Sequence, residues 1–273
     1  MWYSADMKLR KKTPLTITPN SLNSWNKWLA VLHAVQGILV LVLSKANSWP
    51  VHTTFLTQDT AASKIAEKPV LAPAIHNIFN VNLAYLVATF FFMSAIAHAV
   101  IATKYRKTYE ADLKKGINKA RWIEYGLSAS VMMVAIALLS GVYDFSALLM
   151  IFILDLLMNS MGLVMELTNQ GAKKTNWITY NLGCVAGIVP WIVFAIYVIG
   201  ANAYGSGGIP TFVYFIYGSM FVFFSSFAVN MYLQYAKKGQ WANYLYGERV
   251  YMILSLVAKT ALAWQVFFGT LRP

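Results

Sequence analysis

Hydrophobic residues in this chain gather into seven long, continuous stretches that short polar segments separate. Each stretch is long enough to cross the hydrocarbon core of a bilayer as a helix, which takes about 20 apolar residues. The stretches lack the alternation of apolar and polar residues that a membrane β-barrel requires. We therefore predict an all-α integral membrane protein with a bundle of seven transmembrane helices. Their predicted bounds are 26–46, 78–103, 116–140, 145–167, 176–200, 211–236 and 248–270.

The overall composition agrees with this prediction, because 58% of the 273 residues are hydrophobic and only 12% are charged. Soluble domains carry about 25% charged residues. The connections are short and no repeat recurs at a fixed period, so we predict a single domain over 1–273. The segment 1–25 is polar and basic and has no apolar run, so we expect no cleavable signal peptide. Cys184 is the single cysteine, which excludes an internal disulfide.

The basic residues lie mostly in every second connection. They are Lys8, Arg10, Lys11, Lys12, Lys27, Lys104, Arg106, Lys107, Lys114, Lys115, Lys119, Arg121, Lys173, Lys174, Lys237, Lys238 and Arg249. Because cytoplasmic connections are enriched in lysine and arginine, we predict a cytoplasmic N-terminus and an extracellular C-terminus in the cell membrane. Membrane lipids with anionic head groups are the expected partners of these loops. The sequence contains no motif that indicates specific nucleic-acid binding.

The longest predicted outside connection is 47–77. It combines the β-forming run "HTTFLT" with three prolines, Pro50, Pro69 and Pro73. We predict that this extracellular loop forms a small structured cap on the bundle. The other outside connections are short.

Lys259 lies at the centre of the last apolar stretch, about ten residues from either end. A charge at this depth costs roughly 2.5–3.5 kcal/mol, so the side chain is neutral, paired or covalently modified. A buried amine is nucleophilic and condenses with an aldehyde to form a Schiff base. Ser255 precedes Lys259 by four residues and shares its helix face.

A protonated Schiff base is a fixed cation and needs a buried anion. Two carboxylates fall well inside the predicted spans, Glu124 and Asp155. Ser128 shares a helix face with Glu124, which makes Glu124 the better partner for a buried cation. For Asp155 we expect a protonated acid that is hydrogen-bonded to its neighbours, such as Asn159.

Two histidines, His33 and His98, also fall within predicted spans, and Ser94 lies one turn before His98. Such histidines are either hydrogen-bonded structural residues or the lining of a polar, hydrated cavity. A lone histidine in a helix more often has the structural role, but the placement of both between the centre and the cytoplasmic half of their helices favours the cavity. No cluster of His, Cys, Asp or Glu has the spacing of a metal site, and no nucleophile–base pair indicates an enzyme.

"RWIEYGLSAS" (121–130) together with "YMILSLVAKTALAWQVF" (251–267) resembles the heliorhodopsins, retinal proteins with inverted topology. The resemblance covers essentially the whole chain and implies a rhodopsin-like seven-helix fold. It implies that Lys259 carries all-trans retinal as a Schiff base and that Glu124 is the counterion. Ser255 takes the place where pumps have a second carboxylate. The polar residues near the chromophore or its cytoplasmic cavity are then Tyr125, Ser128, Ser94, His33 and His98.

A polyene needs an apolar slot with flat walls. Trp191, Phe215 and Met161 are our candidates for its walls, although such residues also serve packing or face lipid. Gly183–Gly187 has small-xxx-small spacing, which permits close approach of helices. The family resemblance further implies a homodimer, largely through the fourth and fifth helices.

We predict a light sensor that signals through conformational change to an unidentified cytoplasmic partner, without pumping ions. Pumps carry a donor carboxylate about three turns beyond the counterion, where this chain has Ala135 and Ile136. Two alternatives stay open: a light-gated ion or proton channel or transporter, and a light-dependent regulator of a cytoplasmic enzyme.

Overall fold

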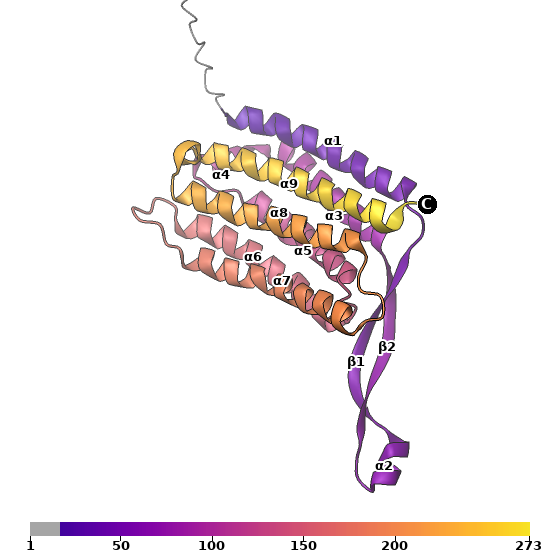
Figure 1. Cartoon of the computed structure of the whole chain (residues 1–273). Helices are drawn as coiled ribbons and strands as arrows, with labels where there is room; N and C mark the ends of the chain where they lie inside the picture. The colour runs from indigo at the N-terminus through magenta and orange to yellow at the C-terminus, as the bar shows by residue number, and fades with distance from the viewer. Residues whose placement is uncertain (1–16) are drawn as a thin grey trace, which may run out of the picture.

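Residues 17–273 are described by a computed structural model, and seven membrane-length helices form its body (Figure 1). The predicted seven-helix fold is confirmed. The helices are α1 (Pro19–Leu43), α3 (Leu83–Ala102), α5 (Lys119–Leu139), α6 (Phe145–Thr168), α7 (Ile178–Tyr204), α8 (Thr211–Tyr235) and α9 (Tyr244–Val266), which a π-helical turn extends to Leu271. The basic residues Lys8, Arg10, Lys11 and Lys12 lie outside the described residues.

Three predicted helix starts were wrong by several residues. α1 begins at Pro19 because the Thr18 side chain accepts a hydrogen bond from the Ser21 amide and proline suits the first turn. α3 begins at Leu83, since the preceding residues belong to a strand. α9 begins at Tyr244, where Asn243 caps the helix.

The long connection after α1 forms a β-hairpin instead of a cap. Strands β1 (Ser48–Gln58) and β2 (Leu71–Asn82) pair antiparallel, and the short helix α2 (Thr60–Ala66) closes the tip. The hairpin extends away from the bundle (Figure 1). The predicted local structure is therefore present, but it does not cap the bundle. The strands hydrogen-bond to each other, and most of their side chains are exposed. We call this end of the bundle the hairpin end and the opposite one the N-terminal end.

The base of the hairpin is tied to the connection between α5 and α6. The amide of His52 donates to the Tyr143 carbonyl at 3.0 Å, and that of Thr54 donates to Asp144 Oδ2 at 3.1 Å. Asp144 Oδ1 also accepts from the amides of Ser146 and Ala147, at 3.0 and 3.2 Å, and thereby caps α6. One carboxylate thus anchors both the hairpin and the helix.

The Asp144 anchor is expected to depend on pH. A hydrogen bond from the Ser146 hydroxyl, helped by backbone amides, lowers the pKa of Asp144. A lowered folded pKa stabilises the anchor fully above the unfolded value of about 3.9, and this stabilisation is lost as pH falls through the folded pKa. Asp144→Asn should therefore speed hydrogen exchange at Thr54 at neutral pH. Asp59→Asn, which affects only the cap of α2 at the tip, should leave Thr54 unchanged; equal protection in both variants contradicts the anchor.

A short helix, α4 (Arg106–Lys114), follows α3 at the N-terminal end and was not predicted. Tyr109 and Leu113 are buried against Leu22, Leu29 and Ile101 of the neighbouring helices. Two buried apolar residues among nine are too weak a pattern to recognise in the sequence, so only the packing reveals this helix.

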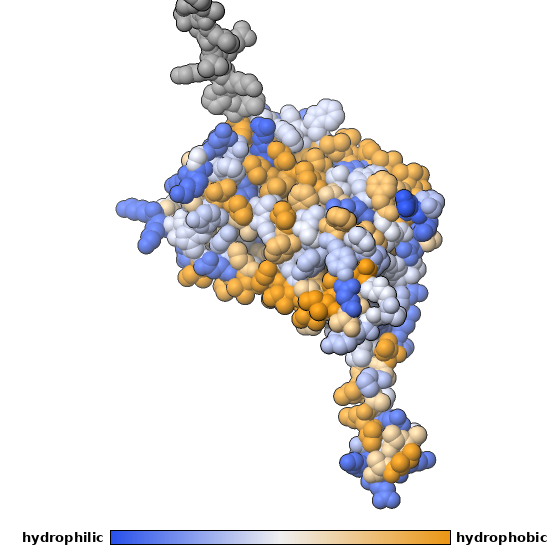
Figure 2. All heavy atoms as spheres, in the orientation of Figure 1, coloured by the Kyte–Doolittle hydropathy of each residue, from blue (hydrophilic) through white to orange (hydrophobic). Residues whose placement is uncertain are grey.

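The interior of the bundle is polar toward the N-terminal end and apolar toward the hairpin end. Phe90, Met133, Ile136 and Val266 belong to one large apolar cluster at the hairpin end. The buried polar side chains toward the N-terminal end include Asn23, Asn26, His33, His98, Asn118, Arg121, Glu124, Glu166 and Glu248. On the outside, apolar side chains cover much of the visible face (Figure 2), as expected where helices contact lipid.

Candidate functional site

Lys259 of α9 and Glu124 of α5 form a buried ion pair in the middle of the bundle. The Nζ atom of Lys259 lies 3.0 Å from Glu124 Oε1, and the two side chains are 3% and 4% exposed. Lys259 Nζ also donates to Ser255 Oγ at 2.8 Å, one turn earlier on the same helix. Lys259 is therefore in direct contact with both Glu124 and Ser255, as the sequence predicted.

Glu124 is also held by two hydroxyl groups. Ser94 of α3 donates to Oε1 at 2.5 Å, and Ser128 of α5 donates to the same atom at 2.7 Å. One carboxylate oxygen thus receives three hydrogen bonds, two from hydroxyl groups and one from the Lys259 amine. The Ser128 contact follows from helix spacing, whereas Ser94 reaches Glu124 only because α3 packs against α5.

The two histidines stack on each other beside this ion pair. Their ring centroids are 5.7 Å apart with an interplanar angle of 9°. His98 Nδ1 lies 2.7 Å from Asn26 Oδ1, whereas His98 Nε2 and both ring nitrogens of His33 have no partner among the described residues. Buried polar atoms of this kind are usually satisfied by ordered water.

A small cavity of about 20 Å³ lies next to these groups, and this is enough for one water molecule. His98, Asn26, Glu124 and Tyr125 contribute to its lining, as do Arg121 and Glu248 nearer the N-terminal end. A small polar cavity therefore lies between the Lys259–Glu124 pair and the N-terminal end of the bundle. Of the two histidines expected to line such a cavity, His98 does so and His33 does not.

A separate, mainly apolar cavity borders Lys259 and runs between α5, α6, α7, α8 and α9. Its lining residues are Trp122, Tyr125, Ala129, Met132, Met158, Asn159, Gly162, Thr179, Tyr180, Gly183, Cys184, Phe224, Phe227, Ala228, Met231, Ser255, Ala258 and Lys259. The ring of Tyr125 lies 5.3 Å from Lys259 Nζ, and its hydroxyl donates to the Tyr251 carbonyl at 2.8 Å. The amine therefore sits at a boundary, with a polar space on one side and a carbon-lined space on the other.

The predicted walls of an apolar slot need correction. Phe215 is 69% exposed on the outside of α8 and does not reach the cavity. Trp191 is buried but lies behind the wall, where it packs edge-on against Phe224. Met161 contacts the α7 backbone near Gly183 and does not line the cavity. Aromatic content alone did not indicate which face of each helix is turned inward.

The small-residue spacing of Gly183 and Gly187 is used within the chain. A Cβ atom at Gly187 would lie 2.5 Å from the Met158 sulfur, and one at Gly183 would lie 3.4 Å from Met161 Cβ. The two glycines thus allow α7 to pack closely on α6 beside the apolar cavity.

Asp155 lies outside the Lys259 site. Its Oδ2 atom accepts from Asn159 at 3.1 Å and from Ser130 at 3.2 Å, and the residue is 2% exposed. The hydrogen bonding to neighbours that the sequence indicated is present, and it links α5 to α6.

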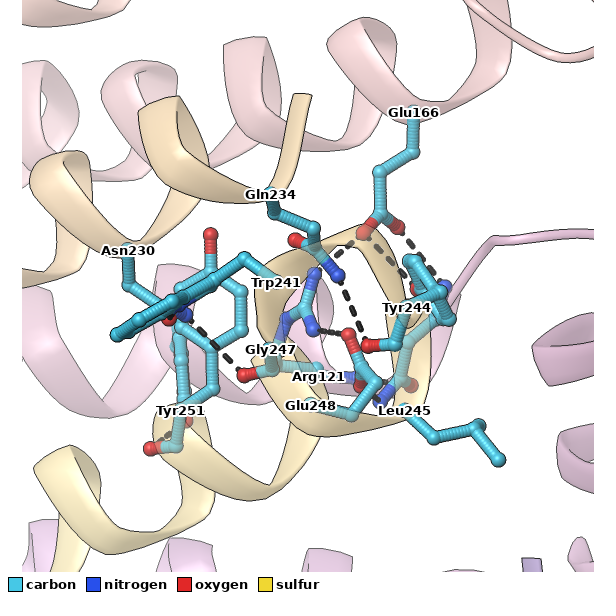
Figure 3. Close-up of polar contacts among 12 residues, drawn as sticks. Arg121, Glu166, Asn230, Gln234, Trp241, Tyr244, Leu245, Gly247, Glu248 and Tyr251 are labelled. Carbon is cyan, nitrogen blue, oxygen red and sulfur yellow. Dashed lines mark hydrogen bonds and ion pairs between the residues drawn. The ribbon is translucent and has the colours of Figure 1, made fainter. Parts of the chain in front are cut away.

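Sequence reasoning missed a buried ionic network at the N-terminal end (Figure 3). Arg121 of α5 contacts Glu166 of α6 at 2.5 Å and forms a second ion pair with Glu248 of α9. Asn118 binds both carboxylates: its amide donates to Glu166 at 2.8 Å and its side chain to Glu248 at 2.7 Å. The hydroxyl of Tyr244 donates to Glu166 at 3.0 Å.

Arg121 was counted among the basic residues of a connection, but it is only 5% exposed. Its guanidinium carbon lies 3.9 Å from the ring centroid of Tyr251, so it is stacked as well as paired. Charged residues at the ends of apolar stretches, such as Glu166 and Glu248, resemble loop residues in a sequence. One feature of the sequence could have revealed this network: Glu166 and Glu248 are predicted to lie at the same level of the membrane as Arg121.

Comparisons with known proteins agree on a fold and a family. A model of the heliorhodopsin family matches residues 22–271. Among solved structures, the chain is similar to a light-driven proton pump, LR (Mac), from Leptosphaeria maculans, with a TM-score of 0.61 and 14% identity over 90% of this chain and 94% of that chain. This identity supports the fold alone. No curated protein sequence matches the chain.

Proposed function

This chain belongs to the heliorhodopsin family, which makes it a retinal-binding, multi-pass membrane photoreceptor, and from this premise we propose how it works. All-trans retinal is bound covalently to Lys259, Glu124 is the counterion, and light drives conformational signalling without net ion transport. The observation that carries this proposal is the position of Lys259 Nζ, between a carboxylate at 3.0 Å and an apolar cavity.

The residues around Lys259 fit such a chromophore. The amine opens onto a cavity with carbon-rich walls from Trp122, Met132, Phe224 and Phe227, as a polyene requires. On the other side, Glu124 supplies one negative charge for one cation. Ser255 takes the hydrogen bond that a second carboxylate would take in a two-anion site.

When bound, retinal supplies a light-driven isomerisation beside a protonated nitrogen on Lys259. Glu124 stabilises that positive charge, and Ser94 and Ser128 hold its carboxylate in place. The polar space that includes His98 and Asn26 offers the neighbouring positions to which a proton can be displaced. The residues of the apolar cluster toward the hairpin end cannot accept a proton. This supports return of the proton to Lys259 through the polar space by which it left.

Net pumping is disfavoured by the residues beyond Glu124 on α5. Ala135 and Ile136 are completely buried in the apolar cluster, at 0% and 1% exposure, where a one-way relay requires an ionisable group. We therefore infer that the proton leaves and returns on one side.

We further propose that the N-terminal end faces the cytoplasm and the hairpin faces the outside. The basic connections support this orientation. A cytoplasmic signalling partner would then contact the loops around α4, and a homodimer is the expected assembly.

The proposed function is tested by adding all-trans retinal to the protein in membranes. We expect a visible absorption band and, in illuminated vesicles, no net change of internal pH. A missing band would contradict retinal binding, whereas a band together with steady proton uptake or release would contradict only the absence of pumping.

Glu124→Gln tests the counterion. The carboxamide keeps the shape of the side chain but removes the negative charge, and a buried cation without its partner costs about 3–5 kcal/mol. We expect the visible band to shift and the protonated form to be partly lost at neutral pH. Asp155→Asn is the matched control, because Asp155 is equally buried but has no contact with Lys259. An unchanged band in Glu124→Gln would contradict the assignment.

A further inference from the structure

A second cavity lies at the hairpin end and shares no lining residue with the cavity beside Lys259. Its volume is about 1030 Å³, which compares with about 300–1,000 Å³ for small-molecule sites. The walls come from the ends of α5, α7 and α9, the start of α8 and the segment before β1. We call it the hairpin-end cavity.

The chemistry of the hairpin-end cavity is amphipathic. Trp49, Tyr143, Tyr197 and Phe212 supply flat, mainly apolar walls. Among residues 17–273, Lys45 is the one charged residue in its lining, and no carboxylate accompanies it there. The cavity therefore suits a molecule with an apolar body and a single negative charge.

The position of the cavity indicates where such a molecule comes from. Ile196 belongs to its lining and is 61% exposed on α7, a helix that is long and apolar enough to span a membrane. The cavity is therefore accessible from the bilayer. Lys45 is also fixed to the end of α9, since its amide donates to the Leu271 carbonyl at 2.8 Å. This contact fixes the backbone of Lys45 beside the cavity, just beyond the end of α1.

We propose that the hairpin-end cavity binds a long-chain fatty acid, with the carboxylate at Lys45 and the chain against the aromatic walls. One cation matches one singly charged head group, whereas a phosphate monoester would leave negative charge unpaired. This site is independent of the retinal site and goes beyond the proposed function.

Gly200 provides a clean way to fill the cavity. A Cβ atom at this lining position meets no atom within 4 Å, so a larger side chain can start here and occupy space in the cavity. Gly218 on α8 also meets no atom within 4 Å but does not line the cavity. Gly218→Leu is therefore the matched control for Gly200→Leu.

The test measures binding of tritiated palmitate to the retinal-loaded protein in phosphatidylcholine nanodiscs, after subtraction of empty nanodiscs. We expect saturable binding that Gly200→Leu weakens by about tenfold or more and Gly218→Leu leaves unchanged. Lys45→Gln should weaken it roughly two- to fivefold, as for an exposed ion pair. Hexadecanol and lysophosphatidate should compete more weakly than unlabelled palmitate.

The proposal would be overturned if the wild type showed no saturable binding of palmitate. It would also be overturned if Gly200→Leu bound palmitate as strongly as the wild type. Competition by hexadecanol as strong as that by palmitate would refute the role of charge, and equal competition by lysophosphatidate would refute the single-charge assignment. The visible band is recorded for every variant. A retained band in Gly200→Leu shows an intact fold and separates this test from that of retinal binding.

Discussion

Lys259→Ala is expected to abolish the visible absorption band completely, because no other lysine in the described part of the chain borders the apolar cavity. Without the amine no covalent bond to an aldehyde can form, so the effect is a loss and not a shift. The measurement is the absorption spectrum after addition of all-trans retinal, compared with the wild type. A band of normal intensity in Lys259→Ala would refute the assignment of the attachment site.

The variant needs a control, since removal of Lys259 leaves Glu124 buried without its cation. An unpaired buried charge costs about 3–5 kcal/mol, which could unfold the protein by itself. Lys259→Ala combined with Glu124→Gln removes both charges and should fold more stably. If this double variant is folded and still colourless, the missing amine is the cause. Binding of a preformed Schiff base between retinal and a short alkylamine to Lys259→Ala should restore a band in the same cavity.

Arg121→Met is expected to cause the largest loss of stability among single substitutions at the N-terminal end. The methionine would leave Glu166 and Glu248 facing each other without a cation, at 1% exposure each. Breaking a buried ion pair typically costs about 3–5 kcal/mol. We therefore expect the melting temperature of the retinal-loaded protein to fall by on the order of 10 °C, followed through loss of the visible band on heating.

Arg106→Met is the matched control. Arg106 contacts Glu110 at 2.8 Å, but both side chains are partly exposed, at 43% and 29%. Such pairs contribute about 0–1 kcal/mol, so this variant should melt close to the wild type. A triple variant with Arg121→Met, Glu166→Gln and Glu248→Gln should recover part of the loss. Equal melting of Arg121→Met and Arg106→Met would show that the network contributes little.

Much of the fold could be predicted from the sequence, because the membrane simplifies the pattern. A helix in lipid must be apolar over its whole length, so α7 and α8 stand out without any knowledge of packing. The same rule makes Lys259 conspicuous. Its partner Glu124 could be predicted too, since few carboxylates lie at that depth.

The remaining features depend on contacts between helices that are distant in the chain. The link from Ser94 to Glu124 joins residues 30 positions apart, and that from Arg121 to Glu248 joins residues 127 apart. No local period contains such information. The walls of the apolar cavity were missed for the same reason: Phe224 and Phe215 lie on one helix, and only its rotation in the bundle decides which of them turns inward.

The uneven polarity of the interior has an electrical consequence under the proposed function. Charge displaced from Lys259 can move toward His98 and Asn26, whereas Phe90, Met133 and Ile136 block the other direction. In a membrane with all copies oriented alike, a flash would then produce a brief current of one sign, followed by a current of the opposite sign that carries the same amount of charge back. Continuous light would drive no steady current. Each photocycle would therefore displace charge across part of the membrane and then return it on the same side.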